Sequence, residues 1–429
     1  MKKKLIALML CGALAVATLS GCGGNNAGNS TPAPAEETEA EEAEAEAEAE
    51  PASGESAGAG TALSDIKVGV IVIGDENEGY TEAHLKGIEG MKQNLGLSDD
   101  QILIKTNIPD TEVTYDAALD LVDQGCNIIF ANSFGHETYM MQAAEEYPDI
   151  EFCHATGFQA AGSGLKNFHN YFTAIYQSRY VSGVVAGLKL NEMIDNGEIT
   201  AEDALIGYVG AYPFAEVISG FTSFYLGARS VCPSVTMNVK YTNSWGDMAL
   251  EKEMAKQMVA DGCVLLSQHS DTTGTPTGAE EEGVPCVGYN ISMISAAPNS
   301  ALTSATVDWS KYYTYAVQCK IDGTPIDVDW AKGYPEGVNL ITELNEGVVA
   351  EGTKEKVDEV EAQLTAGTLN VFDTSTFTVD GKTMEELIAE GGDYEKYGAY
   401  VSDGYFHESE LASAPAFDLI IDGINAQVD

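Results

Sequence analysis

The stretch IKVGVIVIGDENEGYTEAHLKGIEGMKQNL, residues 66–95, contains the two patterns that decide the fold. Its opening run, residues 66–73, is almost entirely apolar, which is typical of a strand buried on both faces. After a polar turn, side chains recur at helical spacing on one face: His84, Ile88, Met91 and Leu95. A buried strand followed by an amphipathic helix predicts a βα unit of a parallel α/β sheet.

The same alternation continues along the chain. Further strands are predicted at residues 102–105, 127–131, 150–154 and 167–173, then at 205–210, 235–241, 264–268, 284–288 and 302–307. Helices are predicted between them, at residues 115–123, 136–147, 179–190, 214–228, 248–260, 275–282 and 312–321. Two runs of one pattern followed by extra segments favour two similar doubly wound lobes with several crossings. Two independent domains joined once remain an open alternative.

The N-terminus predicts export. Lys2, Lys3 and Lys4 precede an apolar run that ends near Leu19 and is too short to be a spanning helix. Leu-Ser-Gly-Cys then closes the segment, so we expect residues 1–21 to be a lipoprotein signal peptide and Cys22 to be acylated. Two acyl chains give stable anchoring at ~0.8 kcal/mol per buried methylene. An ordinary secreted protein with a chance cysteine is the alternative.

Residues 22–63 are predicted to form a disordered acidic tether. The stretch has ten glutamates, no basic residue and almost no large apolar side chain, so nothing offsets the entropy of ordering it. Residues 54–58 spell the G-x-S-x-G of hydrolase nucleophile elbows. That motif requires a strand before it and a helix after it, and neither is predicted here. We therefore do not assign it a catalytic role.

Charge and cysteine spacing exclude several classes of partner. The formal net charge of −46 repels nucleic acid and anionic lipid. Six cysteines of the folded region lie outside any metal-ligand spacing: Cys126, Cys153, Cys232, Cys263, Cys286 and Cys319. We expect them to be mostly reduced core residues, with a disulfide left open for an exported protein. No metal site, cofactor or catalytic residue is predicted.

Ligands of doubly wound sheets bind at the carboxyl ends of the strands, beside helix N-termini. The loops at these places hold aromatic, amide and carboxylate side chains but no Lys or Arg, so they suit a planar, polar-edged heterocycle better than phosphate. Tyr80 is either a stacking platform or a cap on its helix, and Trp245 in a polar loop is predicted to face the ligand. Trp309 either contacts the ligand or packs under the sheet edge. Glu216 either contacts the ligand or only stabilises its helix.

His269 and Asp271 on one loop raise the question of a metal or an acid–base pair. No third ligand at suitable spacing accompanies them, so an enzymatic role is disfavoured.

At these loops the chain resembles the basic membrane protein family of ABC-transporter binding lipoproteins, which includes purine-nucleoside receptors. The motifs that carry the resemblance are Gly79-Tyr80-Thr81-x-x-His84-x-x-Gly87, Arg179-Tyr180-x-x-Gly183-x-x-Ala186-Gly187, Pro213-x-x-Glu216-Val217-Ile218-x-Gly220, Thr242-Asn243-Ser244-Trp245, Gln268-His269-Ser270-Asp271 and Leu302-Thr303-Ser304. Each is weak alone, but the combination in this order is specific. It covers about residues 66–339 and the remainder more loosely.

The resemblance implies the type I periplasmic-binding-protein fold, with two lobes joined by a three-strand hinge and a ligand in the cleft. Crossings are then expected near Thr173, Ser300 and Trp330. Lobe 1 would comprise residues 64–174 and 301–330, and lobe 2 residues 175–300 and 331–429. By resemblance, a base lies between Tyr80 and Trp245, and Ser133, Phe134, Glu216 and Asp271 line the pocket.

The chain departs from the family where nucleoside-binding members hold a ribose. Asn290 and Ser292 stand where those members usually carry paired aspartates, and Val307 stands in place of a lysine. Asn290 and Trp309 complete the predicted ligand-binding set. The departures favour a free base such as adenine over a nucleoside.

The resemblance implies a monomeric, lipid-anchored solute-binding protein on the outer face of the bacterial cytoplasmic membrane, or in the periplasm. It would capture a purine base or nucleoside and deliver it to an ABC permease. A sugar or another small solute in the same fold is the first alternative, because a fold does not fix its ligand. A sensory or adhesin surface lipoprotein is another alternative, and an enzyme is the least favoured.

Overall fold

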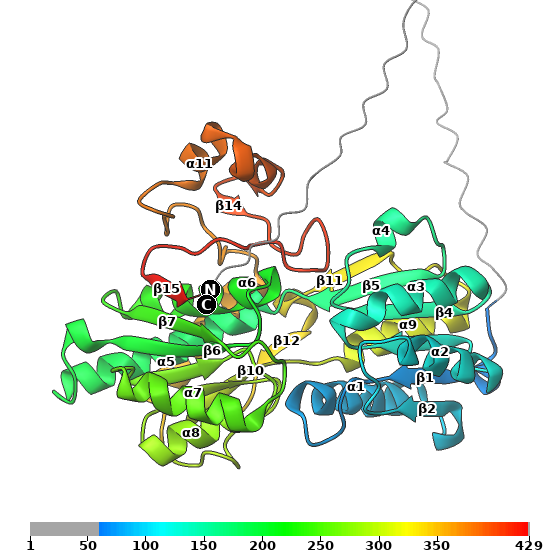
Figure 1. Ribbon diagram of the computed structural model, residues 1–429, viewed down its shortest axis with the longest axis horizontal. Coiled ribbons are helices and arrows are strands. Elements are labelled where there is room, and N and C mark those ends of the chain that lie inside the picture. The colour runs from blue at the N-terminus through cyan, green and yellow to red at the C-terminus, as the bar shows by residue number, and fades with distance from the viewer. Residues whose placement is uncertain (1–59, 428–429) are drawn as a thin grey trace, which may run out of the picture. The chain divides into compact units, whose positions relative to one another are not determined.

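The computed structural model describes residues 60–427, which fold into two lobes, each with a helix-flanked sheet (Figure 1). The signal peptide predicted at residues 1–21, the acylated Cys22 and most of the tether lie outside the described residues. No helix within residues 60–427 combines the length and the apolar character that a bilayer crossing requires.

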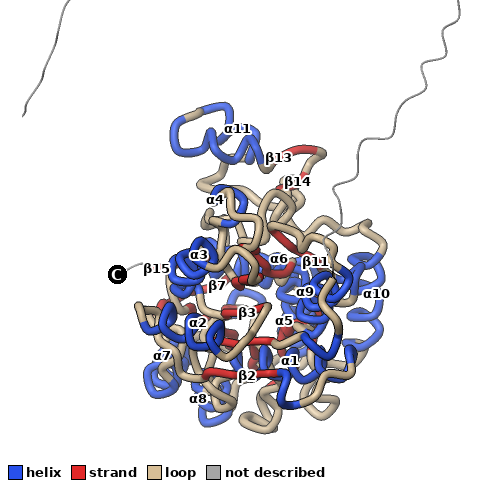
Figure 2. The backbone as a smooth tube through the Cα atoms, turned by 90° about the vertical axis from the view of Figure 1, so that its right-hand side faces the viewer, coloured by secondary structure: helices blue, strands red, loops and turns tan. Residues whose placement is uncertain are grey.

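The first lobe is a parallel sheet with the strand order β11-β5-β4-β3-β1-β2. Its strands are β1 (Val68–Ile71), β2 (Ile102–Lys105), β3 (Ile128–Ala131), β4 (Glu151–Ala155), β5 (Phe168–Thr173) and β11 (Asp329–Lys332). Its helices are α1 (Gly79–Leu95), α2 (Val113–Asp123), α3 (Glu137–Glu146), α4 (Ala160–Ser163) and α9 (Ser310–Asp322). Helices α1 and α9 lie on one side of the sheet, and α2 and α3 lie on the other (Figure 2). Their apolar side chains form the cores on the two faces.

The second lobe has a mixed sheet with the order β12-β10-β9-β8-β6-β7-β15, in which only the β10–β12 pair is antiparallel among the described residues. Its strands are β6 (Leu205–Gly210), β7 (Thr236–Tyr241), β8 (Leu265–Gln268), β9 (Cys286–Tyr289), β10 (Ala301–Val307), β12 (Asn339–Ile341) and β15 (Ile424–Gln427). Its helices are α5 (Tyr176–Asp195), α6 (Ala215–Val231), α7 (Met248–Ala260), α8 (Gly274–Glu282) and α10 (Thr353–Thr365). The core on one face contains α5, α6 and α10, and α7 and α8 pack on the other.

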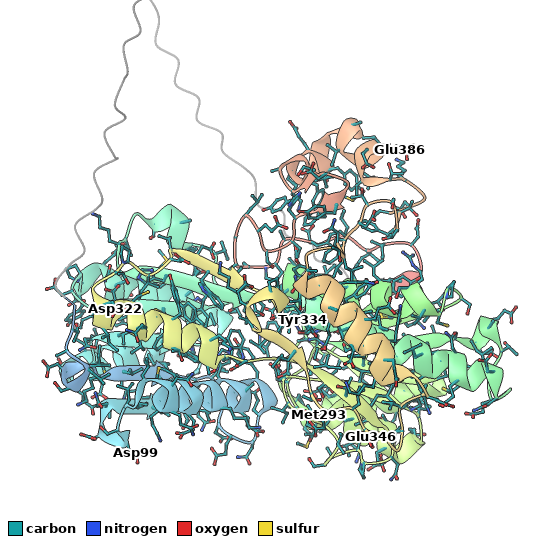
Figure 3. All side chains as sticks on the ribbon, turned by 180° about the vertical axis from the view of Figure 1, so that it is seen from behind. Asp99, Met293, Asp322, Tyr334, Glu346 and Glu386 are labelled. Atoms are coloured by element: carbon teal, nitrogen blue, oxygen red, sulfur yellow. The ribbon has the colours of Figure 1, made fainter. Side chains whose placement is uncertain are left out.

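Three crossings join the lobes, and adjacent crossing segments are hydrogen-bonded. The N–H of Ala174, after β5, donates to the carbonyl of Lys332 at 2.9 Å, and the N–H of Asp308 donates to Val338 at 2.8 Å. At the third crossing the hydroxyl of Tyr334 donates to Glu361 of α10 at 3.1 Å (Figure 3).

One predicted lobe boundary is wrong. Residues 301–330 were expected in the first lobe, but β10 pairs with β9 and β12 in the second sheet. The crossing therefore follows Val307 rather than lying near Ser300. Asp308 precedes α9 and accepts hydrogen bonds from the N–H and the hydroxyl of Ser310, the first residue of that helix, at 3.1 and 2.5 Å. The remaining crossings lie close to the expected Thr173 and Trp330.

The end of the predicted tether is folded. The N–H of Thr61 donates to the carbonyl of Lys320 at 3.1 Å, and the Gln101 side chain donates to the carbonyl of Leu63 at 2.8 Å. Residues 60–63 thus pack on the first lobe and do not belong to the tether. All six cysteines of residues 60–427 are buried and free, as the sequence predicts.

The C-terminal residues complete the second lobe. Beyond α10 the chain forms α11 (Met384–Glu390) and the small hairpin β13–β14 (Val401–Ser402, Tyr405–Phe406), drawn in orange to red above the second sheet in Figure 1. Phe372, Phe377 and Phe417 from this segment belong to the apolar core formed with α5 and α6. The last strand, β15, then adds to the sheet beside β7.

Candidate ligand-binding site

A cavity of about 430 Å³ lies between the lobes, among loops that follow the carboxyl ends of strands from both sheets. The residues that line it are Ile73, Tyr80, Asn132, Ser133, Phe134 and Thr156 from the first lobe and Glu216, Trp245, His269, Asp271 and Tyr289 from the second. A ligand here would contact both lobes.

Tyr80 is fixed from two directions. Glu78 caps α1, and its carboxylate accepts from the N–H groups of Tyr80 and Thr81 at 2.7 and 2.9 Å. The Tyr80 hydroxyl donates to the carbonyl of Asn132 at 2.7 Å, and the edge of its ring packs against His84. The phenol is therefore held in one orientation with its ring against the cavity.

Trp245 projects from a tight loop after β7. Asn243 has a left-handed backbone with φ of 54°, and the hydroxyl of Thr242 donates to the carbonyl of Ser244 at 2.8 Å. The Trp245 indole packs edge-on against Tyr212 at 5.3 Å between ring centroids. Asp271 donates its N–H to the Trp245 carbonyl at 2.9 Å, which ties this loop to the one after β8.

Asp271 places a carboxyl group in the cavity. One of its oxygens, Oδ1, accepts from Nδ2 of Asn290 at 2.8 Å. Burial raises the pKa of this carboxyl well above its usual range, and the nearby carboxylates of Glu78, Glu216 and Glu251 raise that pKa further. The cavity therefore favours a protonated Asp271, or a ligand that donates hydrogen bonds to it.

A second carboxyl group on the cavity wall, that of Glu216, comes from α6 of the second lobe. Burial raises the pKa of Glu216 to about 7, while the Arg179 guanidinium acts in the opposite direction. Glu216 Oε1 is 3.4 Å from Nε2 of His269, whose pKa burial lowers well below its ordinary value, so the ring is neutral. Arg179 stacks over Tyr289 with its Cζ 3.5 Å from the ring centroid and donates to the carbonyl of Gln268 at 2.7 Å.

Asn132 supplies a hydrogen-bond donor on the opposite wall. Its Oδ1 accepts from the N–H of Ile73 at 3.0 Å, which orients the amide. Its Nδ2 is buried and has no hydrogen-bond partner among residues 60–427. Because an unmade buried hydrogen bond costs about 1–3 kcal/mol, this nitrogen is an expected contact for an acceptor atom of a ligand.

Aromatic rings from both lobes meet beside the cavity. The ring of Phe134 lies 5.8 Å from that of Phe214 across the lobes and stacks at 6.3 Å on that of Phe158. Phe214 in turn stacks on Tyr212 at 5.1 Å. Phe134, Phe158 and Phe214 remain partly exposed, so these rings form an apolar cluster beside the cavity, of which Phe134 reaches the cavity wall.

The structure brings six of the eight predicted site residues to the cavity wall: Tyr80, Ser133, Phe134, Glu216, Trp245 and Asp271. Asn290 lies behind Asp271 as its hydrogen-bond donor. Trp309 is buried in the first lobe, where its indole stacks on His84 at 4.1 Å. Both Asn290 and Trp309 border a separate, more open hollow of about 620 Å³.

Five residues that line the cavity were not predicted as site residues: Ile73, Asn132, Thr156, His269 and Tyr289. Each of them ends or follows a predicted strand, so its place at the carboxyl end of that strand could have identified it. Arg179 was also missed as a neighbour of the cavity because it is the fourth residue of α5 rather than part of a loop. Among the described residues, no group of three or more His, Cys, Asp or Glu side chains is placed to hold a metal ion.

Comparisons with known proteins agree with this architecture. A purine-binding protein of Brucella abortus (strain 2308) is 30% identical over 308 residues, 72% of this chain and 83% of that protein. A Haloferax volcanii protein, whose name proposes a glucose-binding role in an ABC transporter, is 31% identical over 265 residues, 62% of this chain and 63% of that protein. The solved structure of an ABC transporter solute-binding protein from Conexibacter woesei shares the fold, with a TM-score of 0.57, 19% identity, and coverage of 71% of this chain and 98% of that one.

The fold comparison confirms the predicted type I architecture. The model of the Bmp family, described as PnrA-like ABC transporter substrate-binding proteins, matches residues 66–368, a range that contains every residue of the cavity wall. This chain therefore belongs to the Bmp family of ABC transporter substrate-binding proteins, which bind solutes and are not enzymes.

Proposed function

We propose that the cavity captures a purine, with a free base such as adenine favoured over a nucleoside, and that the loaded protein delivers it to an ABC permease. The observation that carries this proposal is the composition of the cavity wall. Tyr80 and Trp245 bring aromatic rings from opposite lobes, and Asp271 and Asn132 bring a carboxyl group and an unpartnered amide. Aromatic faces with a few edge-directed polar groups suit a flat heterocycle.

The preference for a base rests on positions 290, 292 and 307, which by resemblance to nucleoside-binding members would hold a ribose and which here border the separate hollow. The Asn290 amide donates to Asp271, and the Ser292 hydroxyl donates to Glu343 at 2.8 Å. Val307 has no polar side-chain atom. These side chains therefore offer a sugar few free hydrogen-bonding groups, and a ribose would gain little by contacting them.

A sugar is the second candidate because of the name of the Haloferax volcanii relative. Hexoses require many convergent hydrogen-bonding groups around their hydroxyls. Four of the eleven residues on the wall of this cavity carry large aromatic rings: Tyr80, Phe134, Trp245 and Tyr289. This composition favours the purine.

Thermal unfolding of the residue 60–429 fragment against adenine, hypoxanthine, adenosine, inosine, uracil and glucose tests the proposal. A ligand that binds only the folded state adds about 2.7 kcal/mol at 100 times its Kd, which is a readily measured shift. We expect purine bases to stabilise the protein and calorimetric titration to show adenosine binding no tighter than adenine. A nucleoside that binds tenfold tighter than its base would overturn the base preference, and stabilisation by glucose alone would overturn purine capture.

The delivery step needs a membrane location. Lys2–Lys4, the apolar run to Leu19 and Cys22 support processing as a lipoprotein at the outer face of the cytoplasmic membrane. The protein is proposed to act there as a monomer. Metabolic labelling with an alkynyl fatty acid should mark the wild-type protein and leave Cys22→Ser unlabelled; equal labelling of both would disprove acylation at this residue.

A further inference from the structure

The exposed phenylalanines of this protein are gathered at one place. Ten of its 13 phenylalanines are buried, whereas Phe134, Phe158 and Phe214 are 41%, 58% and 42% exposed. The rings of these three residues meet beside the ligand-binding cavity. Single exposed apolar side chains are normal on a protein surface, but a cluster that contains every exposed phenylalanine of the chain indicates a role in binding or closure.

Each lobe contributes a stacked pair of rings to this cluster. In the first lobe Phe134 stacks on Phe158 with 6.3 Å between the ring centroids, and in the second lobe Phe214 stacks on Tyr212 at 5.1 Å. The two pairs meet where the rings of Phe134 and Phe214 lie 5.8 Å apart, with their planes inclined by 30°. Aromatic rings attract each other at this separation. The four rings therefore form one continuous row from lobe to lobe.

The backbones that carry the two meeting rings are fixed within their own lobes. Phe214 caps α6, and its carbonyl accepts from the N–H of Val217 at 3.0 Å. Phe134 follows Ser133, whose carbonyl accepts from the N–H of His136 at 3.0 Å. A rigid-body movement of one lobe away from the other would therefore separate the rings rather than carry both along.

Phe214 lies on the solvent side of the cavity wall. Phe134 and Trp245 line the cavity, whereas Phe214 does not. The ring of Phe214 nevertheless contacts both, with its centroid 5.8 Å from that of Phe134 and 6.3 Å from that of Trp245. It bridges two wall residues that come from opposite lobes, and it is placed to close the gap between them rather than to contact a ligand.

We propose that Phe134 and Phe214 form a gate over the cavity. Their rings separate when the lobes open and meet when the lobes close. Phe214 is then a positioning residue that slows the release of the ligand by acting through Phe134 and Trp245. Closure is favoured because it removes from water the apolar faces that the two rings present to each other. The inference rests on the proposed capture of a ligand between the lobes, but it does not require that ligand to be a purine.

Stopped-flow fluorescence measures the release of adenine from the wild-type protein and from Phe214→Ala. The loss of one aromatic pair corresponds to a change in rate of about two- to twelvefold. We expect the dissociation rate constant to rise by that factor and the association rate constant to stay nearly unchanged. Phe214→Tyr keeps the ring and should keep the wild-type dissociation rate. A partly misfolded variant would bind less ligand per protein but would not release it faster.

Acrylamide quenching of fluorescence shows whether the gate shields the cavity. Of the three tryptophans, Trp309 and Trp330 are buried in the core of the first lobe, so acrylamide reaches mainly Trp245 in the cavity wall. With saturating adenine, Trp245 should be quenched more strongly in Phe214→Ala than in the wild type. Phe158→Ala is the control, because Phe158 stacks on Phe134 within one lobe, and it should be quenched like the wild type.

A crosslink tests the gate without a ligand. All six cysteines of residues 60–427 are buried, so in the residue 60–429 fragment a short bismaleimide should react first with the cysteines of the double variant Phe134→Cys/Phe214→Cys. We expect a crosslink within one molecule. Acrylamide should then quench Trp245 less strongly than it does before crosslinking, because the closed gate covers the cavity.

Three results would overturn the gate: an unchanged dissociation rate constant in Phe214→Ala, equal quenching of Trp245 in Phe214→Ala and the wild type, or failure of the two introduced cysteines to crosslink. If adenine does not bind the wild-type protein, the proposed purine function fails, and the crosslinking experiment alone decides whether the gate exists.

Discussion

The N–H of Gly79 donates to the carbonyl of Asp271 at 2.9 Å, and this bond connects the start of α1 in the first lobe to the loop after β8 in the second. A Cβ atom added at Gly79 would lie 2.9 Å from the same carbonyl oxygen and 3.4 Å from Cγ1 of Ile291. Glycine is thus required here by the close approach of the two lobes.

Gly79→Ala should weaken ligand binding without unfolding the protein. The added methyl group pushes the lobes apart at this contact, and losing a hydrogen bond worth about 1 kcal/mol corresponds to an affinity about fivefold lower. Alanine is a better helix former than glycine at this first position of α1, so the melting temperature of the free protein should not fall. Titration calorimetry with adenine measures the affinity, small-angle scattering measures the separation of the lobes, and thermal unfolding measures the melting temperature.

Gly246→Ala is the control, because a Cβ there meets only Cγ2 of Thr272 at 3.4 Å, an ordinary contact. Its affinity should match the wild type. Equal affinities for Gly79→Ala and the wild type would show that the Gly79–Asp271 contact does not contribute to the ligand-bound form.

Trp245→Ala should raise the Kd for a purine by one to two orders of magnitude, because stacking contributes ~1–3 kcal/mol per base. Phe158→Ala removes another exposed aromatic ring that packs on Phe134 but does not line the cavity, and it should change the Kd by less than about threefold. Calorimetric titration of both variants checks this difference. Indistinguishable affinities for Trp245→Ala and the wild type would remove Trp245 from the site.

Trp309 should behave as a core residue. Its indole is 3% exposed and stacks on His84, so Trp309→Ala should lower the free energy of unfolding by about 3–5 kcal/mol. The milder Trp309→Phe keeps the protein folded and should leave the Kd for adenine unchanged. Urea unfolding and calorimetric titration give the two quantities; a tenfold change in Kd for a stable Trp309→Phe would instead indicate a ligand contact.

Glu408 should make the stability of the C-terminal segment depend on pH. This buried carboxyl accepts from the N–H groups of Ala416 and Phe417 at 3.0 and 2.9 Å, and burial raises its pKa from 4.5 to about 7. A raised folded-state pKa means that its stabilising contribution is complete below pH 4.5 and is lost as the pH rises through about 7.

Glu408→Gln does not titrate, so its free energy of unfolding relative to the wild type should rise by up to about 3 kcal/mol between about pH 5 and about pH 8. Glu216 is present in both proteins and contributes equally to each. Urea unfolding at the two pH values measures the difference. A constant difference between the proteins would show that Glu408 does not titrate in this range.

Local sequence patterns were sufficient to predict most strands and helices up to residue 322. Strands such as β3 and β6 are short apolar runs between amphipathic helices, and that alternation is visible in the sequence itself. The lobe to which β10 belongs could not be predicted from local sequence, because the strand's sequence ALTSATV fits either sheet. Its assignment depends on pairing with β9 and with β12, and β12 comes more than thirty residues later.

For the site, topology predicted the loops but not the orientation of each side chain. Tyr80 and Trp245 follow strands of opposite lobes and both line the cavity. Trp309 also follows a strand, yet its indole turns toward His84 because the first residues of α9 pack directly on Gly87 of α1. That packing depends on how two distant helices meet, which no local pattern encodes.

The position of β11 has a consequence for how the chain acquires its structure. β11 pairs in parallel with β5, with Asp329 opposite Asn170, and five of the seven strands of the second sheet lie between these two strands in the sequence. The entropy of closing so long a loop must be overcome before this pair gains any stability, and distant strand pairings of this kind slow folding. During synthesis the first sheet therefore lacks an edge strand until most of the second lobe has emerged, so a nascent chain that stops before Asp329 has β5 as an open edge available to other chains.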